Sequence, residues 1–347
     1  MLPSLSHTFN RYKTLRTHRI SALPIVILMP HSACNCRCVM CDIWKDNKNL
    51  HQLTKDDIAG LLGSLMQLET KLVVMSGGEA LLNHNFFRLC EIFNRVGIKV
   101  SLLTTGLTIK HHAGQIIKHV RDIIVSLDGD QQLHDAIRNI PGCFQKLKEG
   151  VQYIHKLNPG YPITGRTVIH RLNFWNWPAI IHEAKAMGLK QISFLPADVS
   201  SHAFNRQMAW EEPRQHEILL SEKELPELQR VIDQILKENH EDFESGFIAE
   251  SPEKIQHIYD YYAAYYGLNP FPFKRCNAPW VSAVVEADGN VRPCFFHDVM
   301  GNIRQQSFTS IINSDKAVSW RKQLDMGTDS TCVKCVCSLN LSPTTRL

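Results

Sequence analysis

The sequence predicts an α/β fold in which short parallel strands alternate with helices. Short apolar runs recur between residues 24 and 195, and helical patterns separate one run from the next. Polar or glycine-containing segments follow several of the runs. Alternation of this kind is typical of β-α units that build a parallel sheet. We expect six strands, over residues 24–29, 72–75, 98–103, 123–127, 167–170 and 191–195.

Helix signals lie between these strands. Thr54 is followed by two aspartates within three residues, a pattern that indicates the start of a helix. Helical periodicity also predicts helices over residues 85–96 and 175–187. Each of these segments connects one expected strand to the next, as a parallel sheet requires.

The alternation of predicted strands and helices ends after residue 200. Ser221-Glu-Lys-Glu224 forms a capping box, which predicts a helix to about residue 238. A second helical stretch, at residues 259–266, holds five of the eight tyrosines of the chain. We interpret these tyrosines as packing between domains rather than as the lining of a substrate cavity. Further on, Asp288-Gly289 between two apolar runs predicts a β-hairpin.

Composition excludes several classes of protein. The apolar run at residues 20–29 is too short to span a bilayer, and no small-residue cleavage site follows it. We therefore expect no membrane span and no secretory leader. The net charge of +4 is spread along the chain, so we expect no nucleic-acid partner. The eleven cysteines are clustered, which favours metal ligands in a reducing compartment, the cytoplasm.

The most informative motif is the run Cys34-Asn-Cys-Arg-Cys38-Val-Met-Cys41. Thiolates in a CxxxCxxC spacing can hold a 4Fe-4S cluster through three irons, which leaves the fourth iron open to another ligand. Cys36 is interpreted as a bystander that points elsewhere. Closely spaced cysteines also form zinc knuckles or pack as buried thiols, and both alternatives stay open from the motif alone.

The motif resembles that of the radical S-adenosylmethionine (SAM) superfamily. The resemblance implies a partial (β/α)6 TIM-like barrel in which Cys34, Cys38 and Cys41 hold the cluster and the free iron binds SAM. An electron from the cluster then cleaves SAM to a 5'-deoxyadenosyl radical, which abstracts hydrogen from a substrate. It also implies an electron donor such as flavodoxin or ferredoxin.

Further motifs at the expected strand ends support the resemblance. Gly77-Gly78-Glu79 resembles the family's GGE motif, in which the carboxylate accepts from the SAM ammonium group. By the same resemblance Thr105, Ser126, Arg138 and Asn173 contact SAM, and the arginine suits its carboxylate. Taken singly, these residues could instead be turns, loop caps and a solvated arginine.

A second group of cysteines lies near the C-terminus. Cys276, Cys294, Cys332 and Cys335, with Cys337 close by, resemble the SPASM/twitch extension, a β-hairpin and helix module that carries auxiliary Fe-S clusters. A full SPASM module has more cysteines, so we expect one auxiliary 4Fe-4S cluster. Its ligands would be Cys276, Cys294, Cys332 and Cys335. Cys337 would be either a spare thiol or the fourth ligand in place of a neighbouring cysteine. A zinc ribbon is the structural alternative.

Together these observations predict three segments: a radical SAM barrel at 1–200, a helical connector at 201–270 and an auxiliary-cluster domain at 271–347. The expected activity is hydrogen abstraction from a small molecule or a peptide, with net oxidation or modification through the auxiliary cluster. No residue of the chain is assigned as catalytic. The segment before residue 24 is too short for the fused leader-binding domain of many peptide-modifying relatives. The alternative is a non-catalytic zinc-binding interaction protein, which would need none of the SAM contacts.

Overall fold

The computed structural model describes residues 5–203 and 209–347, and within them nine strands form one sheet. The order is β6-β5-β4-β3-β2-β1-β7-β8-β9. Strands β1 to β6 are parallel, β7 joins β1 in parallel, and β8 and β9 continue antiparallel. Their bounds are β1 Ile25–Leu28, β2 Leu72–Met75, β3 Lys99–Thr104, β4 Asp122–Ser126, β5 Ile163–Ile169, β6 Gln191–Pro196, β7 Ser282–Val285, β8 Asn290–Arg292 and β9 Gly301–Asn302.

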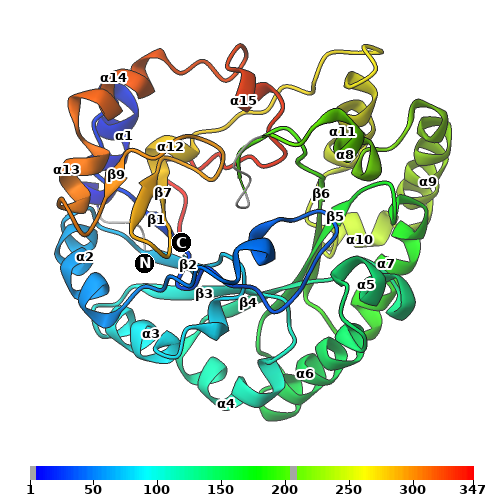
Figure 1. Cartoon of the computed structure of the whole chain (residues 1–347), viewed down its shortest axis with the longest axis horizontal. Coiled ribbons are helices and arrows are strands. Elements are labelled where there is room, and N and C mark those ends of the chain that lie inside the picture. The colour runs from blue at the N-terminus through cyan, green and yellow to red at the C-terminus, as the bar shows by residue number, and fades with distance from the viewer. Residues whose placement is uncertain (1–4, 204–208) are drawn as a thin grey trace.

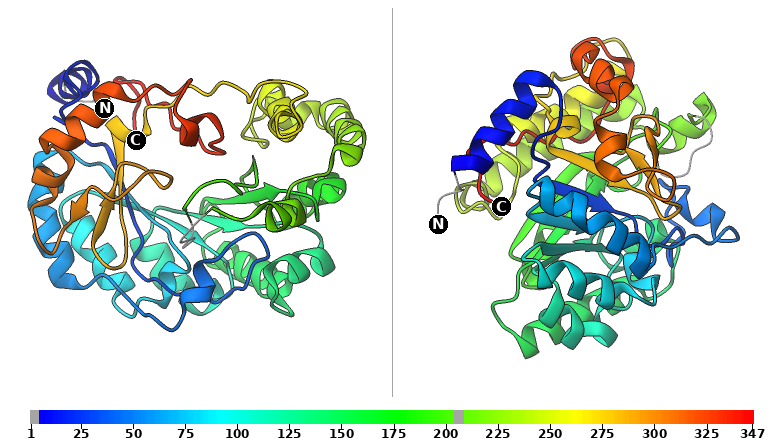
Figure 2. Two further views of the ribbon diagram at one scale, coloured as in Figure 1. Left: turned by 45° about the horizontal axis from the view of Figure 1, so that its top comes forward. Right: turned by 90° about the vertical axis from the view of Figure 1, so that its left-hand side faces the viewer.

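Helices connect and cover the strands. Those of the β-α units lie on the outer side of the curved sheet, and the C-terminal segment, orange to red, lies along its open side (Figure 1, Figure 2). The helices are α1 Leu5–Thr17, α2 Lys55–Gln67, α3 Phe86–Arg95, α4 Ile109–His119, α5 Gln131–Arg138, α6 Cys143–Leu157, α7 Trp177–Ala186, α8 Glu212–Ile218, α9 Leu225–Glu238, α10 His240–Glu244, α11 Pro252–Ala264, α12 Ala278–Val281, α13 Phe308–Ile312, α14 Asp315–Gln323 and α15 Ser330–Val333. Short 3-10 helices are η1 Ile43–Asp46, η2 Ala80–Leu82, η3 Phe174–Asn176 and η4 Glu222–Glu224.

The predicted α/β class and the open, partial barrel are confirmed, since β6 and β9 stand at opposite ends of the strand order. Five of the six expected strands begin and end within about a residue of the observed bounds. The fifth begins at Ile163, four residues before the expected start. Thr164 and Arg166 interrupt the apolar pattern there, because burial alternates along β5 and these side chains stand on its less buried face.

The predicted helix starts are confirmed by their capping geometry. Thr54 and Asp57 form a reciprocal capping box before α2. Ser221 and Glu224 do the same before η4 and α9, and α9 ends at Glu238 as expected. Each box satisfies backbone N–H groups that have no partner within the helix.

Helix α1 was not expected from the sequence, because its stabilising contacts are polar and distant in the chain. Arg11 is buried and donates to the carbonyl oxygen of Thr345 over 2.8 Å and to that of Ser342. Asn10 donates to the carboxylate of Glu69 over 2.8 Å. Apolar periodicity cannot reveal a helix that is fixed in this way.

The tyrosine-rich helix α11 fastens the connector to the ends of β5 and β6. Tyr261 and Tyr262 are completely buried. The hydroxyl of Tyr262 donates to the carbonyl oxygen of Ile169 and accepts from the N–H of Ala197 over 2.9 Å. The hydroxyl of Tyr261 donates to the carbonyl oxygen of Ala197 over 3.1 Å. For these two tyrosines the expected packing role is confirmed.

The C-terminal hairpin continues the barrel sheet through β7. Residues of β1 and β7 pair in register from Ile25 and Ser282 to Leu28 and Val285. No break in the sheet therefore marks the division at residue 270, and the three-segment division stays a prediction. Among the described residues, no helix is long and apolar enough to cross a membrane.

Candidate cluster and cofactor site

Two loops meet at the carboxyl ends of β1 and β2. The backbone N–H of Glu79, in the loop after β2, donates to the carbonyl oxygen of Ala33 over 3.0 Å. A Cβ atom on Gly78 would lie 2.3 Å from the same oxygen, so only glycine fits there. Gly77 has a φ of +108°, which glycine adopts readily. Because Ala33 precedes Cys34, this contact fixes the cysteine loop against Glu79.

Glu79 is completely buried at this junction. Its carboxylate accepts from the hydroxyl of Thr104 over 2.9 Å and from the N–H and hydroxyl of Thr105 over 2.8 and 2.7 Å. The N–H of Leu81 donates to it over 3.1 Å. Burial raises the pKa of Glu79, and the hydrogen bonds from Thr105 oppose this shift. The donors hold the carboxylate in one orientation between β2 and β3.

Thr105 also links Glu79 to the cysteine loop. Its hydroxyl lies 3.0 Å from the side-chain oxygen of Asn35, the residue after Cys34. The structure therefore brings together three of the predicted groups: the cysteine motif, the Gly-Gly-Glu segment and Thr105. All of them follow strand ends at the carboxyl edge of the parallel sheet, where active sites of such folds lie.

The cysteine loop presents Cys34, Cys38 and Cys41 in one cluster of side chains. Nη1 of Arg138 donates to Sγ of Cys38 over 3.4 Å, and the same guanidinium forms an ion pair with the completely buried Asp128. Donors aimed at a sulfur favour the thiolate, which is the form that binds metal. The three cysteines and their surroundings therefore fit a cluster held by three thiolates. Arg138, expected at the SAM carboxylate, lies beside one of these sulfurs.

Cys36 does not point away from this group as the sequence suggested. It is completely buried, and its thiol interacts with those of Cys38 and Cys143. The thiol of Cys143 in turn lies 3.4 Å from Nε2 of His134. The cysteine loop is irregular, so residue spacing alone could not give the direction of Cys36.

The two other residues predicted to contact SAM, Ser126 and Asn173, differ in their surroundings. Ser126 is half-buried at the end of β4. Asn173 is completely buried, and its amide donates to the carbonyl oxygens of Asp128 and Val168, both over 3.0 Å. Its side-chain oxygen accepts from the N–H of His170 over 2.8 Å. Both amide hydrogens of Asn173 therefore bind backbone carbonyls, one after β4 and one in β5, and a contact with SAM stays a prediction.

The five C-terminal cysteines line one cavity. They come from the segment before α12, from the end of the hairpin after β8, and from α15 and the residues after it. Burial raises the pKa of the Cys294 thiol to about 11. At neutral pH such a thiol loses its proton only when a cation replaces it. Half-buried thiols gathered in this way fit a bound metal cluster, and all five line the cavity that would hold it.

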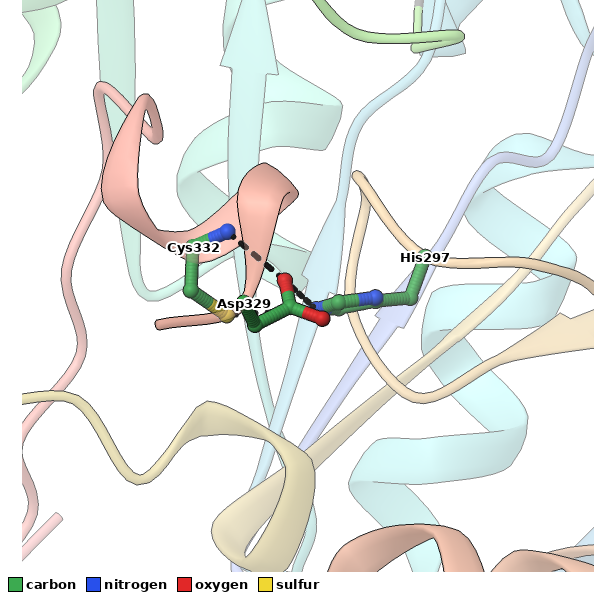
Figure 3. Close-up of side chains that lie close together, drawn as sticks. All are labelled: His297, Asp329 and Cys332. Atoms are coloured by element: carbon green, nitrogen blue, oxygen red, sulfur yellow. Dashed lines mark hydrogen bonds and ion pairs between the residues drawn. The ribbon is translucent and has the colours of Figure 1, made fainter. Parts of the chain in front are cut away.

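His297 belongs to the same cavity, and the sequence interpretation missed it. Its Nε2 lies 3.3 Å from Sγ of Cys332, and its ring meets Trp320 edge-on at a centroid distance of 4.8 Å. Asp329 lies 4.0 Å from His297 and accepts from the N–H of Cys332 over 2.9 Å (Figure 3). These three residues could themselves hold a metal ion. The position of His297 three residues after Cys294 is the signal that could have revealed it.

Comparison with known proteins identifies both regions. The model of the radical SAM superfamily matches residues 28–184, and that of the SPASM iron-sulfur cluster-binding domain matches residues 276–336. The AdoMet-dependent heme synthase of Methanosarcina barkeri is 24% identical over 81% of this chain and 79% of that protein. The subtilosin biosynthesis protein AlbA of Bacillus subtilis is 22% identical over 81% of this chain and 57% of AlbA.

Solved structures share the fold. SuiB of Streptococcus suis, bound to its precursor peptide SuiA, superposes with a TM-score of 0.63 at 11% identity, covering 94% of this chain and 73% of SuiB. Native anSMEcpe with bound AdoMet gives a TM-score of 0.62 at 18% identity, covering 90% of this chain and 86% of that one.

The fold and the two groups of cysteines define an iron-sulfur enzyme that uses SAM. More closely, the chain carries a radical SAM domain at residues 28–184 and a SPASM domain at residues 276–336. Its cofactors are SAM, the 4Fe-4S cluster of the radical SAM domain and the iron-sulfur cluster of the SPASM domain. When bound, the first cluster supplies the electron that cleaves SAM to a hydrogen-abstracting radical. The comparisons give no support to the zinc-binding alternative.

Proposed function

We propose that this radical SAM enzyme oxidises or otherwise modifies a peptide held between the carboxyl ends of the barrel strands and the auxiliary cluster. One observation carries the proposal. Lys274 of the auxiliary cavity lies with its Nζ 5.6 Å from the ring centre of Tyr261, on helix α11, which is hydrogen-bonded to Ile169 at the end of β5 and Ala197 after β6. The auxiliary cavity therefore borders the barrel strands that lie beside the predicted SAM contacts.

The peptide is favoured over a small molecule by several relatives. AlbA is a bacteriocin biosynthesis protein, SkfB of Bacillus subtilis is a maturation protein for a sporulation killing factor, and SuiB was solved with its precursor peptide. A small molecule is the second candidate, since the heme synthase of Methanosarcina barkeri aligns over a larger share of its own length than AlbA does.

We assign the ligands as the sequence predicted them. Cys34, Cys38 and Cys41 hold the radical cluster, supported by the sulfur-directed donor of Arg138. The auxiliary cluster takes four of the five cavity cysteines: Cys276, Cys294, Cys332 and Cys335. Sγ of Cys335 itself donates to the carbonyl oxygen of Cys337 over 3.0 Å, which ties the fifth cysteine to this group.

A reducing compartment suits these thiols. All eleven cysteines lie in described residues, and all are free. We therefore propose the cytoplasm as the location, where thiols stay reduced. A flavodoxin or ferredoxin is the donor we propose for the electron that the radical cluster needs.

The carboxylate of Glu79 is the SAM contact with the most complete geometry. Glu79→Gln removes its negative charge and turns an amide N–H₂ toward donors from Thr104 and Thr105. We expect the Kd for SAM to rise at least about tenfold, or roughly 1.4 kcal/mol. We also expect a loss of stability of about 1–3 kcal/mol, because buried donors lose their acceptor. Calorimetric titration and thermal unfolding measure the two effects.

Glu91→Gln on the outer face of α3 is the control, since that carboxylate forms ion pairs with Arg88 and Arg95 of the same helix. It should leave the Kd for SAM unchanged. A normal Kd in folded Glu79→Gln protein would remove Glu79 from the SAM site.

Anaerobically reconstituted protein tests the activity itself. We expect roughly eight irons per chain, as two four-iron clusters, and 5'-deoxyadenosine on addition of SAM and dithionite. A low-molecular-mass extract of the host cell should stimulate its formation, and protease digestion of the extract should abolish the stimulation. Stimulation that survives digestion would favour the small molecule, and zinc in place of iron would contradict both candidates.

A further inference from the structure

Lys274 stands out among the residues around the auxiliary cavity. Its Nζ atom is buried and makes no hydrogen bond to any residue that the structure describes. The side chain lines the cavity together with all five C-terminal cysteines. A buried ammonium group without an acceptor destabilises the folded protein, and proteins normally pair such a charge.

Among the described residues, Lys274 has an aromatic ring beside it but no carboxylate partner. Nζ lies 5.6 Å from the centre of the ring of Tyr261, a cation-π contact. Such a contact contributes about 0.5–2 kcal/mol and leaves the three N–H donors of the ammonium group unused. The side chain lines the cavity that also holds the thiols of Cys335 and Cys337. The acceptor that completes the site must therefore lie on the cysteine side.

A bound iron-sulfur cluster supplies such an acceptor. Four thiolate ligands bring more negative charge than the iron-sulfide core neutralises, so the site as a whole is an anion. Reduction adds one electron and makes it more negative. A fixed positive charge at the cavity wall stabilises the reduced form more than the oxidised form, because the attraction grows with the negative charge. Charge and hydrogen bonds to sulfur are known to set cluster potentials.

We infer that Lys274 is the counter-ion of the auxiliary cluster and raises its reduction potential. The inference rests on the proposed function in one respect, that the cavity cysteines hold an iron-sulfur cluster. Lys274 is a positioning residue in this scheme, acting on the cluster rather than on the substrate. Its place against Tyr261, which is anchored to Ala197 after β6, holds the ammonium between the connector and the cavity.

The test isolates the auxiliary cluster in the full chain. With Cys34, Cys38 and Cys41 replaced by alanine, only the auxiliary site should bind iron, about four atoms per chain. In this background Lys274→Gln, Lys274→Met and Lys274→Arg are titrated with a reductant and followed by EPR. Arg275→Gln is the matched control, because Arg275 is the neighbouring cation and is exposed.

We expect both neutral variants to lower the ratio of reduced to oxidised cluster at least tenfold at a fixed potential. That change corresponds to a midpoint about 59 mV more negative for a one-electron couple. Lys274→Arg should keep most of the original potential, and Arg275→Gln should leave it unchanged.

The experiment distinguishes failure of the proposed auxiliary cluster from failure of the proposed role of Lys274. Absence of iron when Lys274 is intact would contradict the proposed auxiliary cluster. Four irons with an unshifted midpoint in Lys274→Gln would overturn the role of Lys274 alone. If the neutral variants bind no iron while Lys274→Arg does, the positive charge is needed to hold the cluster, which supports the counter-ion role. Equal loss of iron in Lys274→Arg would overturn it.

Discussion

Replacement of Cys34, Cys38 and Cys41 together by alanine is expected to abolish formation of 5'-deoxyadenosine and to remove about half of the bound iron. The three thiols lie in one cluster of side chains, and the loop that carries them is fixed to the Gly-Gly-Glu segment. Without thiolates there is no ligand for the metal, so no electron reaches SAM. Iron and sulfide analysis and chromatography of the cleaved nucleoside measure the two losses.

Cys36→Ala is the control that the structure makes necessary. Cys36 lies beside Cys38 and could replace a ligand. If the assignment is correct, Cys36→Ala keeps the full iron content and the activity. Cys90→Ala, at a completely buried position in α3, controls for the loss of a buried thiol. Continued SAM cleavage by the triple variant would contradict the assignment of the three ligands.

The strands and the loops that follow them could be predicted because their signals are local. Each strand is a short apolar run, and the residues after it carry the chemistry. The chain order Cys34, Glu79, Thr105, Ser126 therefore translates directly into positions along one sheet edge. Capping boxes at Thr54 and Ser221 were predictable for the same reason, since they involve residues only three positions apart.

Contacts between distant segments could not be predicted in this way. The parallel pairing of β7 with β1 joins residues far apart in the sequence, and neither strand differs locally from an ordinary buried strand. The buried ammonium of Lys274 and the approach of His297 to Cys332 depend on how the C-terminal loops fold around their cavity. Polar residues at such positions resemble exposed ones in a sequence, because burial is a property of the tertiary structure.

Gly78→Ala is expected to lower the free energy of unfolding and to weaken the binding of iron and SAM. The new Cβ would lie 2.3 Å from the carbonyl oxygen of Ala33 and 2.9 Å from Cγ2 of Ile43. The first contact is with backbone and cannot be relieved by a rotamer change, so the two loops must move apart. Overpacking of this kind costs about 1–3 kcal/mol. The displacement also separates Cys34 from Glu79, and we expect reduced iron loading and at least tenfold weaker SAM binding.

Gly63→Ala provides the opposite case. Gly63 is exposed in the interior of α2, and a Cβ there would meet nothing within 4 Å. Alanine should raise stability by about 0.5–1 kcal/mol, because glycine is a poor helix former. Thermal unfolding, iron analysis and SAM titration on both variants separate a general effect of glycine replacement from the specific close approach at Gly78. Full iron loading and normal SAM affinity in Gly78→Ala would show that the contact between the two loops is not what positions the cysteines.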